Sequence, residues 1–171
     1  MALCAVRERL LRILAFVRVG SALIVGGKAG NNMSMKLEIC PKSSFLKVGA
    51  MGEFSLEEAK RTFLEMLDAL ARHNVKKMLF DGREITGEPA LIERFYYGEF
   101  VAQAVKEFAD RGVSRATKFA YALKEPVLDK KRFGETVAVN RGVVVKTFDN
   151  LEDALEWLGI TPANKPYAGD G

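Results

Sequence analysis

Cysteine and histidine are both scarce in this chain of 171 residues. Cys4 and Cys40 are its two cysteines and His73 its single histidine. Two cysteines are too few for a disulfide scaffold, and their spacing is not that of metal ligands. A zinc site would need mostly carboxylate ligands, which is uncommon. We therefore predict no metal site, no cofactor and a reduced, cytoplasmic setting.

An uninterrupted hydrophobic run is also missing. The most apolar stretch, Leu10 to Val25, contains Arg12 and Arg18. Each arginine costs roughly 2.5–3.5 kcal/mol near the centre of a bilayer. The stretch is also shorter than the roughly 20 residues that a spanning helix needs. The sequence therefore predicts no stable insertion into a membrane.

The net positive charge of the chain comes from its first 35 residues. The net charge is +4, and residues 1–35 account for it with five basic residues and one acidic residue. The remainder is neutral, with 21 residues of each sign. A neutral domain lacks the basic surface that phosphate backbones require. We therefore expect no nucleic-acid partner.

Residues 1–34 form an N-terminal extension outside the predicted fold. A glycine-rich stretch, Gly26 to Asn32, precedes Met33 and Met35. The favoured interpretation places the true start at Met33 or Met35; the alternative is an amphipathic helix on a membrane surface. We assign residues 35–160 to one domain and residues 161–171, which contain Pro162 and Pro166, to a flexible tail.

Residues 35–160 alternate between strand and helix patterns. The predicted strands are Lys36–Ile39, Phe45–Ala50, Met78–Phe80, Lys118–Leu123 and Gly142–Phe148. The predicted helices begin at Ser55, which matches a capping box with Glu58, at Pro89 and at Asn150. A polar segment from Glu125 to Arg141 carries a few apolar anchors. The fold class is α/β: a mixed, mostly parallel sheet of four to five strands with three to four helices and an antiparallel opening pair.

The sequence between the third strand and the second helix holds the candidate site. Met78–Phe80 is wholly apolar, as in a central strand covered on both faces, and we expect the strand to end at Asp81. Ligands and partners dock at such strand ends in open α/β sheets. The candidate residues for an interaction or ligand loop, with the start of the following helix, are Asp81, Arg83, Glu84, Thr86, Glu88, Arg94 and Tyr97. The structural alternative is an Asx-turn, in which Asp81 accepts hydrogen bonds from its own loop.

The helix from Pro89 to Gly112 is apolar on two sides. One stripe contains Leu91, Phe95, Ala102, Val105 and Ala109, and the other contains Ile92, Tyr96, Phe100, Ala104 and Phe108. A face this wide exceeds what packing on one sheet requires. If the helix stands off the sheet, the residues that would line a pocket are Phe95, Phe100, Val105 and Phe108.

The order of elements from Lys36 to Gly159 resembles the STAS-like superfamily of sulphate-transporter and anti-sigma-factor-antagonist domains. Four features carry the resemblance: the capped helix from Ser55, the strand that ends in Asp81, the loop and long helix of Gly87–Gly112, and the last strand and helix of Val143–Leu158. The chain is most similar to small stand-alone bacterial members of undetermined function, which also resemble CRAL-TRIO lipid-binding domains. The resemblance covers about three-quarters of the chain and implies a regulatory, protein-binding domain.

One family motif is absent from the chain. The antagonists that the chain resembles carry a phosphorylatable serine at the start of the helix after the third strand. The corresponding stretch here, Ile85 to Ala90, contains no serine, and Thr86 is its single hydroxyl residue. Thr86 is therefore the candidate for phosphorylation, with an ordinary turn residue as the alternative.

From these observations we predict a non-catalytic STAS-like domain that binds another protein and forms a homodimer through the long helix. The alternative is a carrier for a small hydrophobic ligand or lipid. An enzyme is not expected, because only Asp81, Arg83 and Glu84 bring convergent polar chemistry together in the sequence.

Overall fold

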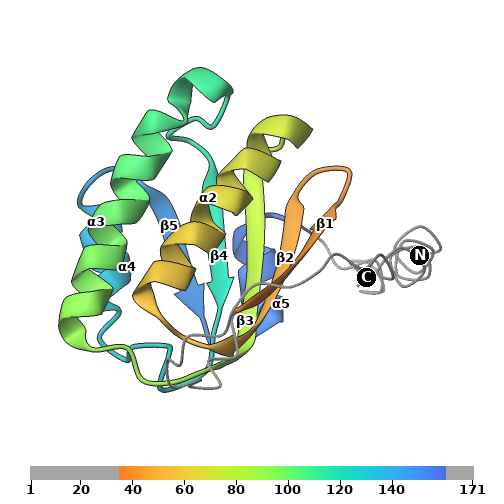
Figure 1. Cartoon of the computed structure of the whole chain (residues 1–171). Coiled ribbons are helices and arrows are strands. Elements are labelled where there is room, and N and C mark those ends of the chain that lie inside the picture. Colours follow the sequence, from red (N-terminus) through yellow and green to blue (C-terminus); the bar gives the residue numbers. More distant parts are fainter. Residues whose placement is uncertain (1–34, 161–171) are drawn as a thin grey trace, which may run out of the picture. The chain divides into compact units, whose positions relative to one another are not determined.

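The computed structural model describes residues 35–160, which form a five-stranded mixed sheet. The strands are β1 (Lys36–Pro41), β2 (Leu46–Glu53), β3 (Lys77–Thr86), β4 (Lys118–Ala122) and β5 (Val144–Phe148), and they lie in sequence order across the sheet. β1 is antiparallel to β2, and the other neighbouring pairs are parallel (Figure 1). The predicted fold class and the antiparallel opening pair are confirmed.

Helices cover both faces of this sheet. The helical elements of the described residues are α2 (Leu56–His73), α3 (Leu91–Glu107), the 3₁₀ turn η1 (Ala109–Arg111), α4 (Phe133–Val139) and α5 (Leu151–Trp157). α2, α3 and α4 lie on one face, and α5 packs behind β3, β4 and β5 (Figure 1). The predictions for residues 1–34 and 161–171 fall outside the described residues.

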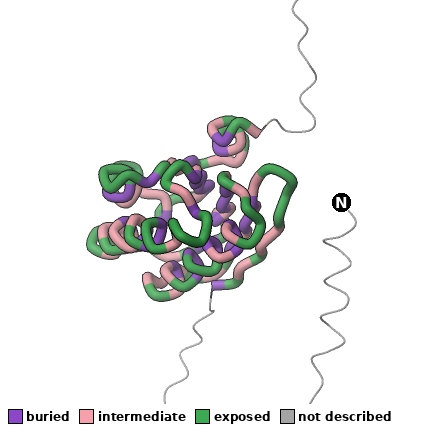
Figure 2. The backbone as a smooth tube through the Cα atoms, turned by 90° about the horizontal axis from the view of Figure 1, so that it is seen from above, coloured by how far each residue is buried: buried purple, intermediate pink, exposed green. Residues whose placement is uncertain are grey.

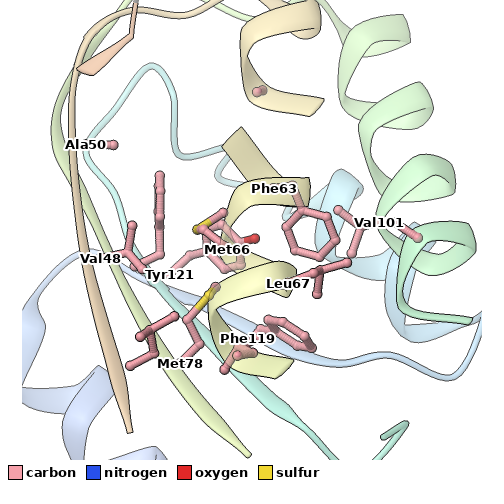
Figure 3. Close-up of a cluster of buried hydrophobic side chains, with 14 of the residues drawn as sticks. Val48, Ala50, Phe63, Met66, Leu67, Met78, Val101, Phe119 and Tyr121 are labelled. Carbon is pink, nitrogen blue, oxygen red and sulfur yellow. The ribbon is translucent and has the colours of Figure 1, made fainter. Parts of the chain in front are cut away.

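The larger hydrophobic core lies between the sheet and α2, α3 and α4 (Figures 2 and 3). Phe63 of α2 is completely buried at its centre. Its ring packs against Phe119 of β4 at 5.8 Å and edge-on against Tyr97 and Phe100 of α3 at 6.3 Å. Aromatic contacts of this kind stabilise a core beyond the burial of their area, so Phe63 joins α2, α3 and the sheet.

Both ends of α2 are capped, and the Ser55 cap is the one that the sequence predicts. The Ser55 hydroxyl accepts a hydrogen bond from the Glu58 backbone N–H at 3.2 Å. Asn74 ends the helix in the left-handed conformation, with φ of 50°. The caps satisfy backbone groups that have no partner inside the helix, so they fix where α2 starts and stops.

The predicted end of the third strand at Asp81 is wrong. β3 continues to Thr86, because β2 is long enough to pair with it as far as Glu53. The pairing is irregular between Gly49 and Met51, where β3 carries an additional residue. The polar stretch after Asp81 is therefore a bulged strand and not a loop.

Gly82 explains why the bulged part of β3 stays in the sheet. A Cβ atom at this position would lie 2.6–2.9 Å from the side chains of Phe80, Leu123 and Ile85. Those three side chains occupy the space above the strand, so only glycine fits there. In the sequence the same glycine, flanked by charged residues, favours a loop.

The polar segment after β4 contains a helix that the sequence did not predict. Asp129 accepts hydrogen bonds from the backbone N–H groups of Lys131 and Phe133, at 3.0 and 2.9 Å. Because these bonds fix the turn that leads into α4, the short helix starts at Phe133.

We predict that Ser55→Ala lowers the free energy of unfolding by about 1 kcal/mol, because it leaves a first-turn N–H of α2 without its acceptor. Urea denaturation of the two proteins measures the difference. Ser44→Ala, in the exposed turn between β1 and β2, is the matched control and should have little effect. Equal losses in both variants would contradict the capping role.

Candidate functional site

The predicted site residues separate into two groups. Asp81, Arg83 and Glu84 belong to β3, whereas Arg94 and Tyr97 belong to α3, on the face of the sheet that α2, α3 and α4 cover. Asp81 and Glu84 line a polar pocket with residues of β1 and β2, and Arg94 and Tyr97 line a different cavity beneath α3, which is partly open to solvent. The structure therefore does not bring the seven residues into one site.

Asp81 and Arg83 form a two-pronged ion pair within β3. Arg83 Nε and Nη2 donate to the two carboxylate oxygens of Asp81 at 2.8 and 3.0 Å. The hydrogen bond from Arg83 lowers the pKa of Asp81, burial opposes it, and the charges of Arg83 and Lys47 add to the lowering. Asp81 thus has a charged partner within the strand, and a general-base role has no support in this geometry.

The other predicted residues of this stretch are exposed. Glu84 and Glu88 face solvent, and the Thr86 hydroxyl donates to the Gly52 carbonyl of β2 at 3.3 Å. Thr86 therefore bridges the ends of β2 and β3. Its phosphorylation stays a prediction.

Arg94 is a structural clamp on the inner side of α3. Its guanidinium donates to the carbonyl oxygens of Pro89, Pro126 and Val127 at 3.1, 2.7 and 2.7 Å. These bonds join the start of α3 to the loop after β4. The side chain is committed to the fold and is not available to a partner.

Tyr97 faces inward, and its neighbour Tyr96 is the exposed aromatic residue. Burial raises the pKa of Tyr97 to about 12, although contact with the Tyr121 hydroxyl opposes the rise. The side chain of Tyr96 is 52% exposed. The prediction that Tyr97 belongs to the exposed side of the helix is wrong, because α3 is rotated so that Tyr97 contacts Phe63.

The same rotation overturns the predicted pocket lining. Val105 is buried in the core, and Phe100 and Phe108 pack against it. Phe95 stacks on Phe133 of α4 with 6.5 Å between ring centres. None of these four residues lines the cavity beneath α3. α3 contributes Arg94, Tyr97, Gly98 and Val101 to the cavity instead.

Three residues that the sequence analysis placed in the apolar stripes, and not among the candidate site residues, are exposed at the start of α3. Leu91, Ile92 and Tyr96 are 64%, 56% and 52% exposed, and they follow one another over the first two turns. We call these three residues the α3 apolar surface. The two apolar stripes of this helix were the available signal, because a helix that packs on a sheet must leave one side outside.

Gly98 fixes the rotation of α3. A Cβ atom there would lie 2.8 Å from the Gly134 carbonyl oxygen and from a methyl group of Val137 in α4. The two helices therefore cross in direct backbone contact. Their approach is secured by Arg141, whose side chain pairs with Glu99 and lies over the Phe95 ring.

No group of three or more histidine, cysteine, aspartate or glutamate residues that could hold a metal occurs within residues 35–160. In the same range, no helix has the length and hydrophobicity needed to cross a membrane.

The fold is similar to that of a solved anti-sigma factor antagonist from Mycobacterium paratuberculosis, with a TM-score of 0.50. The two sequences are 12% identical, and the match covers 74% of this chain and 95% of that one. An uncharacterized protein of the DUF3478 family with a SpoIIAA-like fold, from Shewanella loihica PV-4, matches with 19% identity, 77% and 99% coverage and a TM-score of 0.42. No family model and no curated protein matches the chain. The predicted STAS-like fold is confirmed.

We predict that Asp81→Asn destabilises the protein at neutral pH and has no effect in acid. The pKa of Asp81 in the folded protein lies below its ordinary value of 3.8. Such a carboxylate contributes stability that is complete above the unfolded pKa and is lost as pH falls through the folded pKa. For a partly exposed pair we expect a loss of about 0.5–1 kcal/mol at neutral pH.

Urea denaturation between neutral pH and about pH 2 measures this difference. Asp110→Asn, which changes an exposed aspartate of η1, is the control. A loss that is independent of pH would show that Asp81 acts through packing and not through its charge.

We also predict that Gly98→Ala destabilises the protein by about 1–3 kcal/mol, because the added methyl forces α3 and α4 apart. Gly49→Ala in β2 is the matched control, since its nearest neighbour to a new Cβ is 4.0 Å away. Thermal unfolding of both variants measures the effect. Equal stability of the two variants would contradict direct backbone contact at Gly98.

Proposed function

We propose that this chain is a non-catalytic STAS-like regulatory domain that binds another protein through the α3 apolar surface. The observation that carries the proposal is the exposure of Leu91, Ile92 and Tyr96 within the first two turns of one helix, where Ile92 and Tyr96 are one turn apart on the same side. Single apolar side chains on a surface are ordinary, but a contiguous group indicates an interaction site. Aromatic residues are also enriched in the buried centres of interfaces.

The rigidity of the helix supports this role. Arg94 holds the start of α3 to the loop after β4, and Gly98 holds the middle of the helix against α4. The three exposed side chains therefore stand on a fixed support. A preorganised surface loses less conformational freedom on binding.

The solved protein with the similar fold is, by its name, an antagonist of an anti-sigma factor, which is itself a protein. Binding of a protein partner by this chain is consistent with that comparison. The polar residues that an enzyme would need are engaged elsewhere, since Asp81 pairs with Arg83 and Arg94 holds backbone carbonyls. We further propose that the protein acts in the cytoplasm.

The same surface is our candidate for self-association. Two copies that pair through α3 would bury Leu91, Ile92 and Tyr96 against each other. A protein partner would then compete with the second copy for one surface.

The alternative role as a lipid carrier has less support. The cavity beneath α3 has a volume of about 130 Å³. Pockets for drug-sized ligands have volumes of roughly 300–1,000 Å³. A lipid chain would need the core to open, and the four aromatic and aliphatic residues predicted to line such a pocket are packed elsewhere.

We predict that Ile92→Glu combined with Tyr96→Glu abolishes partner binding and self-association without unfolding the domain. Both side chains are exposed, so the charges cost little in the free protein and much in an apolar interface. The measurement on the full chain is sedimentation equilibrium, together with photo-crosslinking in cells from a benzophenone residue placed at position 91. The wild type should form dimers and one defined crosslinked adduct, and the double variant neither.

Leu64→Glu provides the matched control, because Leu64 of α2 is also exposed, at 38%, but lies outside the α3 apolar surface. It should retain the dimer and the adduct. If the wild type forms no adduct and stays monomeric, or if Leu64→Glu has the same effect as the double variant, the surface assignment is wrong.

A further inference from the structure

The cavity beneath α3 lies between α2, the sheet, α4 and the loop after β4, and it is partly open to solvent. Its lining is mostly apolar. The main apolar contributors are Met66, Phe80, Ile85, Val101, Leu123 and Val127. Its volume of about 130 Å³ is close to that of an engineered apolar cavity of about 150 Å³ that binds benzene. The space therefore admits one small ring.

Two buried hydroxyl groups in this lining have no hydrogen-bond partner among the described residues. They are Thr62 Oγ1, from a residue 2% exposed, and Tyr121 Oη, from a residue 6% exposed. Besides burial, a weak hydrogen-bond contact with the Tyr97 hydroxyl contributes to the raised pKa of Tyr121. This contact lies outside the geometry of a full hydrogen bond, so Tyr121 Oη retains an unused donor or acceptor. A buried polar group without a partner is costly, so such groups indicate a ligand or an ordered water.

Both tyrosine hydroxyls remain protonated at neutral pH. Burial raises the pKa of Tyr97 to about 12 and holds the pKa of Tyr121 well above its ordinary value. The cavity therefore offers neutral hydroxyls, each of which can donate and accept.

The charged residues at the cavity are already engaged by the protein. Arg94 donates hydrogen bonds to backbone carbonyls, and Asp129 accepts hydrogen bonds from two backbone N–H groups of its own loop. Arg132 donates to the Thr147 carbonyl at 2.6 Å, and Glu135 accepts from the Thr147 N–H and hydroxyl at 2.7 and 2.6 Å. A charged ligand would find no free counterion here and would lose its hydration. The occupant is therefore uncharged.

We propose that the cavity beneath α3 is a binding site for a small neutral molecule that consists of one apolar ring or short chain and one hydrogen-bonding group. The polar group binds the hydroxyls of Thr62 and Tyr121, and the apolar part packs against Val101 and Phe80. This site is separate from the α3 apolar surface, so ligand binding here does not depend on the proposed protein partner.

Phenol and toluene are the probes that test this site, because they have nearly the same shape and differ in one hydroxyl. Titration of the full chain by calorimetry, with thermal unfolding as a second readout, measures both affinities. We expect phenol to bind with a dissociation constant of about 10 μM to 1 mM, the range for a fragment of this size. Toluene should bind about tenfold more weakly, because it leaves both hydroxyls unpaired.

Thr62→Val and Tyr121→Phe each remove one hydroxyl and keep the shape of the side chain. Both variants should fold with unchanged or higher thermal stability, because each loses an unpaired buried group, and both should lose much of the preference for phenol over toluene. Thr136→Val removes an exposed hydroxyl of α4 and is the control.

Three results would overturn the proposal. The first is no binding of phenol up to about 10 mM, because a fragment that fits the cavity should have a dissociation constant below that concentration. Water would then be the partner of the two hydroxyls. The second is phenol binding that Thr62→Val and Tyr121→Phe leave unchanged, which would place the site elsewhere. The third is binding of benzoate as tight as that of phenol, which would contradict an uncharged occupant.

Discussion

The direct contact between α3 and α4 at Gly98 is the constraint from which the rest of the helical layer follows. No side chain fits between Gly98 and the Gly134 carbonyl, so the two helices meet at one rotation and one separation. In that rotation Tyr97 and Val101 face the sheet, and Ile92 and Tyr96 face solvent. One glycine therefore determines both which side of α3 lines the cavity and which side is open to a partner.

Arg94 complements this contact at the start of α3. A guanidinium group has five donors in a fixed plane, and Arg94 uses them on three backbone carbonyls from two segments. One of these segments, the loop after β4, has few apolar residues to anchor it. Because charged hydrogen bonds to otherwise unpaired carbonyls are strong, one arginine is enough to close the loop over the cavity.

The sequence was sufficient for the parts of the fold that depend on regular apolar spacing and capping. The helix from Ser55, the last strand and the antiparallel opening pair follow from local patterns that the tertiary structure preserves. The stretch from Asp81 to Thr86 could not be assigned correctly, because Gly82 favours a loop locally and is required in the strand by side chains distant in sequence. Local pattern and tertiary packing disagree at this position, and packing decides.

The candidate site was harder to predict from the sequence for a related reason. A helix with two apolar stripes has no single buried face in its sequence, so spacing alone could not separate Tyr96 from Tyr97. The distinction depends on Gly98, and the importance of Gly98 depends on Gly134, which is 36 positions further along the chain. Likewise, nothing in the sequence marks Thr62 and Tyr121 as neighbours of one cavity.

The position of the two candidate sites on one helix has a thermodynamic consequence. The cavity lies on the inner side of α3, and the α3 apolar surface lies on its outer side. A molecule that changes the preferred position of α3 against the sheet would change the affinity of the outer surface, and a protein partner would change the affinity of the cavity by the same factor. The size of this coupling depends on how differently each ligand binds the alternative positions of the helix. Gly98 and Arg94 restrict those positions, so they would keep the coupling small unless the contact between α3 and α4 opens.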